Sequence, residues 1–248
     1  MSAYGDLNPG VAGLIQSQYP KVASGIVQES MTPGLPVFGY TNSGNKVWKL
    51  KADVSKLVVD GDLSASNSTV VTVNSVAAAA VVYATSHAAT MTAILNAIKA
   101  LSGVEAVLDS TDANGRTILI RTKGATATAS AATTGGTART WTPTNGLFGQ
   151  IFKGVLANQS NVPTSVGGSA SFALYDAAPV VTSGEIWVQA ASGVDSLEKA
   201  YVDVSTGAFA ASGQDVGVRC TISRNSDGVA LVAIDDSGLY PLTYADRF

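Results

Sequence analysis

The chain has 248 residues, of which 46% are hydrophobic and only 13% are charged, whereas an average soluble domain has about 25% charged residues. This length can bury a substantial core in one large or two medium domains, which argues against extensive disorder. The formal charge is −3 and no block of like charges occurs, so electrostatic attraction to nucleic acid or to an anionic membrane is not expected.

Two further features concern the compartment. The longest apolar stretch, residues 76–84, is far shorter than the ~20 residues that span a bilayer. The first residues lack the basic and apolar segments of a secretory signal, so we expect synthesis in a cytoplasm. Cys220 is the single cysteine and cannot form an internal disulfide. Its place in a β-like stretch predicts a buried small hydrophobe.

Residues 1–33 mix Pro and Gly with scattered apolar side chains, without helical or strand periodicity. A solvated tail would be polar, so this apolar but irregular segment predicts an extended N-terminal arm that becomes ordered against another surface. Residues 35–50 then predict two short strands around a polar turn.

The next region predicts a compact α+β module inserted at residues 57–139, with the order strand, strand, helix, strand, strand. Its helix follows from an apolar stripe that ends near Gly103, with Ser86 or Thr85 as the N-cap. A turn at 112–115 joins two strands into a hairpin, and the Ala/Thr-rich stretch 125–146 predicts a surface connection or a weak strand. The stripe consists of Met91, Ile94, Leu95, Ile98 and Leu101.

The fold class is therefore mainly β with an α+β insertion: a small β-barrel or sandwich, formed by residues 34–56 and 140–248, preceded by the arm. The even spacing of short β-rich stretches between turn signals supports this prediction. These stretches are residues 150–156, 169–175, 185–190, 200–204, 216–222 and 229–234.

Catalytic patterns are weak. His87 is the single histidine and begins the predicted helix without a nearby carboxylate in sequence, so we expect a surface residue. The acidic pairs all adjoin Gly or Ser, and turn formation explains them without catalysis. Residues 109–115 resemble a calcium loop, but Arg121 stands where the bidentate Glu should be. We therefore expect no catalytic residue, cofactor or metal. The pairs are Asp60/Asp62, Asp195/Glu198 and Asp235/Asp236.

The only local basic cluster lies on the predicted hairpin. It consists of Arg116, Arg121 and Lys123, and no aromatic side chains alternate with them. Binding of single-stranded nucleic acid would need aromatic stacking platforms as well. We therefore expect a solvated hairpin face.

Several segments resemble the head decoration, or structural cement, proteins of tailed bacteriophages. In that family a Gly-x-Ile-Trp-Val strand precedes a Val-Tyr-Val-Asp-x-x-Thr-Gly-x-Phe hairpin in a small β-barrel. The similarity covers about half of the chain in the right order, and the inserted module is a departure from it. The segments are residues 183–190 (Ser-Gly-Glu-Ile-Trp-Val-Gln-Ala), 200–209 (Ala-Tyr-Val-Asp-Val-Ser-Thr-Gly-Ala-Phe), 10–16, 33–38 and 151–157.

The resemblance implies a noncatalytic virion protein that binds the outer surface of the expanded head and bridges subunits of the major capsid protein. It also implies a homo-oligomer, and a trimer would match local threefold positions. The alternative is a host-attachment protein on capsid or tail that uses the insertion for adhesion; a glycan-degrading enzyme is a weaker third. Candidate capsid contacts, which could instead pack on the protein's own barrel, are Tyr4, Leu7, Val11, Leu14, Ile15 and Tyr19.

Overall fold

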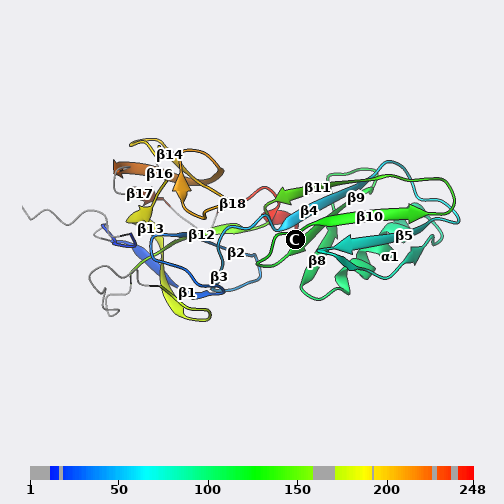
Figure 1. The fold of residues 1–248 in the computed structure, drawn as a ribbon, viewed down its shortest axis with the longest axis horizontal. Coiled ribbons are helices and arrows are strands. Elements are labelled where there is room, and N and C mark those ends of the chain that lie inside the picture. Colours follow the sequence, from blue (N-terminus) through cyan, green and yellow to red (C-terminus); the bar gives the residue numbers. More distant parts are fainter. Residues whose placement is uncertain (1–11, 17–18, 159–170, 192, 225–227, 236–239) are drawn as a thin grey trace, which may run out of the picture. The chain divides into compact units, whose positions relative to one another are not determined.

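A computed structural model describes residues 12–16, 19–158, 171–191, 193–224, 228–235 and 240–248 (Figure 1). The fold is mainly β, as predicted. The chain forms two compact units, which we call the barrel unit (residues 1–50 and 150–242) and the inserted unit (residues 51–149 and 243–248). No described helix is long and apolar enough to cross a membrane.

The barrel unit is a nearly closed sheet that has ten strands in the described residues. Seven strands follow the order β15-β14-β16-β17-β13-β1-β3, and β12 joins them through β13 and pairs with β2 and β18. The strands are β1 (Lys21–Val27), β2 (Pro36–Gly39), β3 (Lys46–Val47), β12 (Ile151–Leu156), β13 (Ala177–Gln189), β14 (Lys199–Val202), β15 (Phe209–Ala210), β16 (Gln214–Arg224), β17 (Val229–Ile234) and β18 (Tyr240–Pro241).

The long strand β13 organises this sheet. Near Val180 it pairs with β1 on one edge and with β12 on the other, and beyond Gly184 it pairs with β17. Side chains from β1, β2, β3, β12 and β13 meet in one apolar core, which burial of their surface stabilises. This core contains Val27, Met31, Val37, Val47, Leu156, Phe172, Ala178 and Val180.

The inserted unit contains two four-stranded sheets, in the order β10-β5-β6 with β7 also on β5, and in the order β11-β4-β9-β8. The helix α1 packs against β8, β5 and β7 (Figure 1). The elements are β4 (Val54–Val59), β5 (Ser68–Val73), β6 (Val76–Ala77), β7 (Val81–Val82), α1 (His87–Lys99), β8 (Val104–Leu108), β9 (Thr117–Thr122), β10 (Ala129–Thr134) and β11 (Trp141–Leu147); a short 3-10 helix, η2 (Ala245–Arg247), follows near the C-terminus.

The predicted helix and hairpin are confirmed. Ser86, not Thr85, is the N-cap, and its Oγ accepts the Ala89 N–H at 3.1 Å. The helix ends before Gly103, which adopts the left-handed conformation with φ of +72°. The apolar stripe faces the core of the inserted unit, where Met91, Ile94 and Ile98 are buried and Leu95 and Leu101 partly buried.

The arm and the insertion have different boundaries from those predicted. Residues 21–27 form β1, a strand inside the sheet and not part of an extended arm, because Gly25 lets β1 approach its neighbours closely: a Cβ at this position would lie 2.8 Å from Val180 Cγ2. The inserted unit begins at residue 51 and ends at residue 149, since β4 pairs with both β9 and β11. Residues 243–248, predicted as barrel, belong to it too.

Two predicted β stretches also differ. Residues 35–50 form the two short strands β2 and β3 around a turn, as predicted. β2 pairs with β12 and β3 with β1, however, and Phe38 and Trp48 form an isolated bridge with each other. The stretch 169–175 does not form the predicted strand in its described part. There Phe172 makes an isolated bridge with Met31, and a turn follows it before β13 begins.

Candidate functional site

Residues 12–16 of the predicted arm lie along the second half of β13 and extend the barrel sheet. The Gly13 N–H donates to the Trp187 carbonyl at 2.7 Å, and the Trp187 N–H donates to the Leu14 carbonyl at 2.9 Å. Ile15 forms an antiparallel bridge with Ile186. This segment is therefore held by backbone hydrogen bonds, as an added edge strand would be.

The predicted contact residues fall into three groups. Leu14 is half-buried and packs against the cluster of Trp187, Val229 and Leu231 on its own barrel. Ile15 is also half-buried, whereas Tyr19 is 90% exposed. Tyr4, Leu7 and Val11 lie outside the described residues. Leu14 and Ile15 thus make intramolecular contacts, and Tyr19 is accessible to a partner.

A groove of about 400 Å³ runs beside this edge. Trp187 and Leu231 are buried beneath it, and Ile222 is exposed at its side. Glu185 and Gln16 supply polar groups, and the Gln16 N–H already donates to the Glu185 carbonyl at 2.9 Å. The groove combines an apolar floor with a polar rim, which is the usual composition of a small protein–protein contact.

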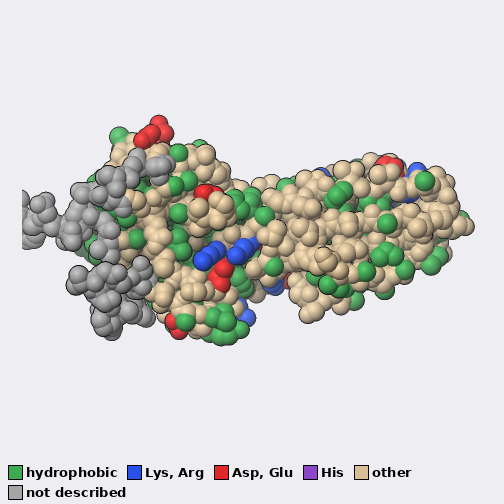
Figure 2. Space-filling model, viewed as in Figure 1, with side chains coloured by type: hydrophobic (Ala, Val, Ile, Leu, Met, Phe, Trp, Pro, Cys, Tyr) green, Lys and Arg blue, Asp and Glu red, His purple; other side chains and the backbone are tan. Residues whose placement is uncertain are grey.

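The inserted unit has a sheet without charged side chains. The sequence contains no Asp, Glu, Lys or Arg from 63 to 98 or from 124 to 138, so β5, β6, β7 and β10 are all uncharged. On the face shown in Figure 2, charged side chains are sparse. Val76 and Val82 are exposed at the edge of this sheet.

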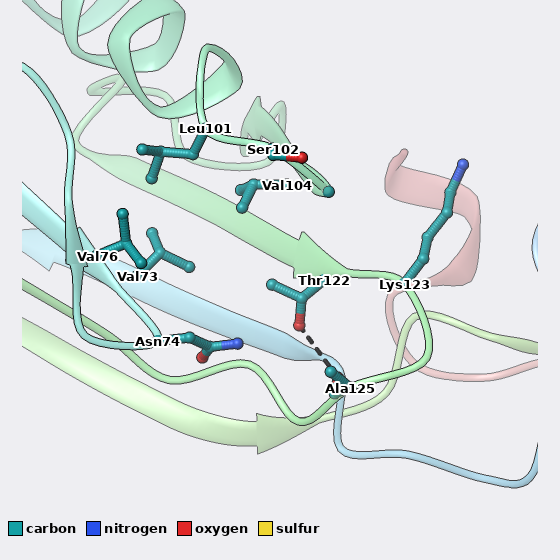
Figure 3. Close-up of a pocket in the computed structure, with 10 residues that line it drawn as sticks. Val73, Asn74, Val76, Leu101, Ser102, Val104, Thr122, Lys123 and Ala125 are labelled. Carbon is teal, nitrogen blue, oxygen red and sulfur yellow. Dashed lines mark hydrogen bonds between the residues drawn. The ribbon is translucent and has the colours of Figure 1, made fainter.

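A cavity of about 290 Å³ in the inserted unit is lined by the ends of β5 and β9, the start of β6 and the loop between α1 and β8 (Figure 3). The side chains of Val73, Val76, Leu101 and Val104 supply apolar walls, while the Lys123 side chain points away. Two of its polar groups are engaged within the chain: Thr122 Oγ1 donates to the Ala125 carbonyl at 3.0 Å, and Asn74 Nδ2 to the Thr126 carbonyl at 3.1 Å. The cavity therefore offers apolar contact but no convergent polar groups for specificity.

His87 is not the surface residue that the sequence predicts. Its side chain is 13% exposed, because Leu63 lies over the start of the helix and donates its N–H to His87 Nδ1 at 3.0 Å. Nε2 lies 3.9 Å from Asp62 Oδ1. Since Nδ1 accepts a hydrogen bond, the neutral ring carries its proton on Nε2. The hydrogen bond to Nδ1 attaches residue 63 to the first turn of α1.

Carboxylates of the inserted unit stabilise turns and ion pairs. Asp112 accepts the N–H groups of Asn114 and Arg116 at 3.0 and 2.9 Å and the Thr117 hydroxyl at 2.7 Å. That Thr117 hydrogen bond holds the pKa of Asp112 below its usual range. The hydrogen bond from Arg116 likewise lowers the pKa of Asp62. Depressed pKa values of this kind suit hydrogen-bonded turn residues and not a general acid.

The predicted solvated face holds for only part of the basic cluster, since Lys123 is exposed and Arg116 half-buried but Arg121 is not accessible. Arg121 is buried, because β9 is an inner strand between β4 and β8. Its guanidinium forms an ion pair with Glu105 and donates to the Gly149 carbonyl at 3.1 Å. Lys123 Nζ lies 2.7 Å from Glu105 as well. Arg116 pairs with Asp62 at 2.9 Å. The spacing of Arg116, Arg121 and Lys123 in sequence indicates one basic hairpin face and does not reveal this network. The informative feature is an arginine inside the otherwise apolar strand β9.

Cys220 is buried in β16, as predicted, and burial raises the pKa of its thiol. Among the described residues no group of three or more His, Cys, Asp or Glu side chains is placed to hold a metal ion. No protein-family model matches the chain, and no curated protein matches it.

Proposed function

We propose that this protein is a bacteriophage head decoration protein that binds the outside of the expanded capsid and bridges major capsid protein subunits. One observation carries the proposal. The segments that resemble the decoration family are far apart in sequence, yet their described parts are neighbours in the barrel unit. Residues 13–16 and residues 151–157 both pair with β13, and β2 pairs with β12. Ala190, at the end of the 183–190 segment, bridges to Phe209.

The chemistry of the described surface supports this proposal. A protein present in many copies on a shell works by binding a state that exists only after assembly, and such binding stabilises the shell by mass action, by about 2.7 kcal/mol at a hundred times Kd. This task needs exposed contact area and no reaction centre. The uncharged sheet of β5, β6, β7 and β10, with its exposed Val76 and Val82, and the exposed Tyr19 before β1 offer such area.

Co-sedimentation with capsids tests the proposal. Purified protein is mixed with expanded heads and with unexpanded procapsids of the same phage, and the pellets are compared. We expect binding to expanded heads only. Failure to pellet with either particle would refute the decoration function.

The arm needs a separate variant. Deletion of residues 2–30 would remove β1 from the sheet, so the informative deletion covers residues 2–11 only. We expect the shortened protein to keep its circular dichroism spectrum and lose capsid binding. Tyr19→Ala tests the exposed side chain as a capsid contact. Leu14→Ala is the control, because the Leu14 side chain packs on the protein's own barrel. If both the deletion and Tyr19→Ala bind heads normally, the arm is not the contact.

A second candidate is host attachment through the inserted unit. The specific observation is the uncharged sheet β10-β5-β6 together with the apolar cavity of Figure 3. Binding of fluorescently labelled protein to host cells tests it. Retained cell binding in a protein that does not pellet with heads would favour attachment over decoration.

A further inference from the structure

A tight turn at residues 173–176 projects two large apolar side chains from the barrel unit. The Asp176 carboxylate accepts the Ala173 N–H at 2.7 Å, and the Asp176 N–H donates to the Ala173 carbonyl at 3.1 Å. The Tyr175 N–H donates to the Val27 carbonyl at 2.8 Å, which attaches the turn to the end of β1. The turn is therefore held in one conformation.

This conformation is unfavourable for the residues that occupy it. Tyr175 has φ of +73°, in the left-handed region that glycine or asparagine adopts more readily. Its side chain is 70% exposed, and that of the preceding Leu174 is 50% exposed. Burial within the chain thus does not explain either side chain. A rigid, exposed tyrosine in a strained conformation is instead typical of a residue held for contact with a partner.

The same unit contains a cavity that such a turn could enter. It has a volume of about 260 Å³, below the ~300–1,000 Å³ of small-molecule pockets, which suits one large side chain. Gly25, Val47 and Val180 are buried at its floor, and Ala23 is exposed at its mouth. Its lining residues come from β1, β3, β12 and β13, which are labelled in Figure 1, and from residues 44–45.

The charges of turn and cavity are complementary. No acidic side chain of the described residues lines the cavity, whereas Lys153 lines it and Lys21 and Lys46 lie beside its lining residues on β1 and β3. The turn contributes the carboxylate of Asp176. Opposite charges at the edge of an apolar contact favour this orientation and increase the association rate.

We propose that the turn of one copy inserts Tyr175 into the Gly25 cavity of a second copy and places Leu174 against the rim of that cavity. Every copy then carries both partners of the contact, as a symmetric homo-oligomer requires. The contact involves the barrel unit alone and needs no capsid, so it goes beyond the proposed function and its failure would leave capsid binding untouched.

Cysteine cross-linking in solution tests the pairing. Tyr175→Cys and Ala23→Cys proteins, each also carrying Cys220→Ala, are mixed under mild oxidation without capsids. We expect a disulfide-linked dimer in the mixture and at least tenfold less in either protein alone. Val22→Cys replaces Ala23→Cys as the matched control, because Val22 is an exposed residue of the same strand that does not line the cavity. Equal yields with Val22→Cys and Ala23→Cys would overturn the proposal.

Two further variants separate contact from folding. Tyr175→Gly relieves the left-handed strain, so its Tm should equal or exceed that of the parent while self-association, measured by sedimentation equilibrium, weakens at least tenfold. Ala23→Phe should fill the cavity and likewise weaken self-association at least tenfold. Val22→Phe should leave self-association unchanged. A parent protein that stays monomeric at its highest soluble concentration refutes the contact. So does unchanged association in Tyr175→Gly, including the case in which that variant loses only capsid binding.

Discussion

The guanidinium carbon of Arg121 lies 4.3 Å from the centre of the Phe248 ring, so the C-terminal residue covers a buried cation of the inserted unit. Two further contacts hold the same segment. The Tyr244 N–H donates to the Phe148 carbonyl at 2.9 Å, and Arg247 Nη1 lies 3.5 Å from Asp109 Oδ1. The last six residues of the chain are thus part of the fold of a unit whose other residues end at Gly149.

Removal of the Phe248 ring should destabilise the inserted unit selectively. A cation–π contact to a largely desolvated arginine is worth about 1–2 kcal/mol, so Phe248→Ala should lower the free energy of unfolding by that amount. Hydrogen exchange should become faster in β8 and β9 and stay unchanged in β13 and β17. Thr243→Ala, at an exposed position, is the control. Uniform acceleration in both units would contradict this assignment.

The inserted unit should lose stability in acid. Burial acts to raise the pKa of Glu105, but hydrogen bonds from Lys123 and Arg121 outweigh it and the pKa is lowered. The pKa values of Asp62 and Asp112 are lowered too, through hydrogen bonds from Arg116 and Thr117.

A carboxyl whose pKa is lower in the folded state contributes stability that is complete above its unfolded value, about 4, and is lost as pH falls through the folded value. The Tm should therefore stay level from neutral pH to about pH 5 and fall below about pH 4. Asp112→Asn should lower the Tm at neutral pH and reduce the slope in acid. An unchanged slope would mean that Asp112 does not contribute to the loss of stability in acid.

Loss of the helix cap gives a local test. Ser86→Ala leaves the Ala89 N–H without its side-chain acceptor and should cost about 1 kcal/mol of stability in urea unfolding. Thr85→Ala, at the neighbouring exposed residue, should cost much less. Equal losses would mean that the helix starts one residue earlier.

The buried thiol should be inert in the native state. Cys220 is fully buried and burial raises the pKa of its thiol, so the nucleophilic thiolate is scarce and inaccessible. Thiol reagents should label it only on unfolding. Cys220→Ser should cost about 1–3 kcal/mol, because it buries a hydroxyl where a hydrophobe packed, and Cys220→Ala should cost less. Rapid labelling of the folded protein would contradict the buried position.

Local patterns predicted the elements whose cause is local. The helix follows from the spacing of Met91, Ile94 and Ile98, and the hairpin follows from turn residues between two apolar runs. The burial of Cys220 follows from its apolar neighbours along β16.

The remaining features depend on partners that are distant in sequence. β1 contains Gly25 and lacks a regular alternation of apolar and polar side chains, and it forms a strand because β13 and β3 pair with its two edges. Arg121 is buried because Glu105 and the Gly149 carbonyl satisfy its guanidinium. The turn at residues 173–176 depends on the Val27 carbonyl, which no pattern near Tyr175 reveals. Candidate contact surfaces were harder still, since an exposed side chain leaves no periodic signal.

The chain leaves the barrel unit and returns to it at adjacent points, because Gln150 Nε2 donates to the Lys49 carbonyl at 3.2 Å. Because the two ends of the insertion are this close, it interrupts the sequence of the barrel without separating the strands that pair in it. A foreign domain with neighbouring termini could take its place, provided that the shortened chain also ends at Leu242, since residues 243–248 would no longer have a surface to bind.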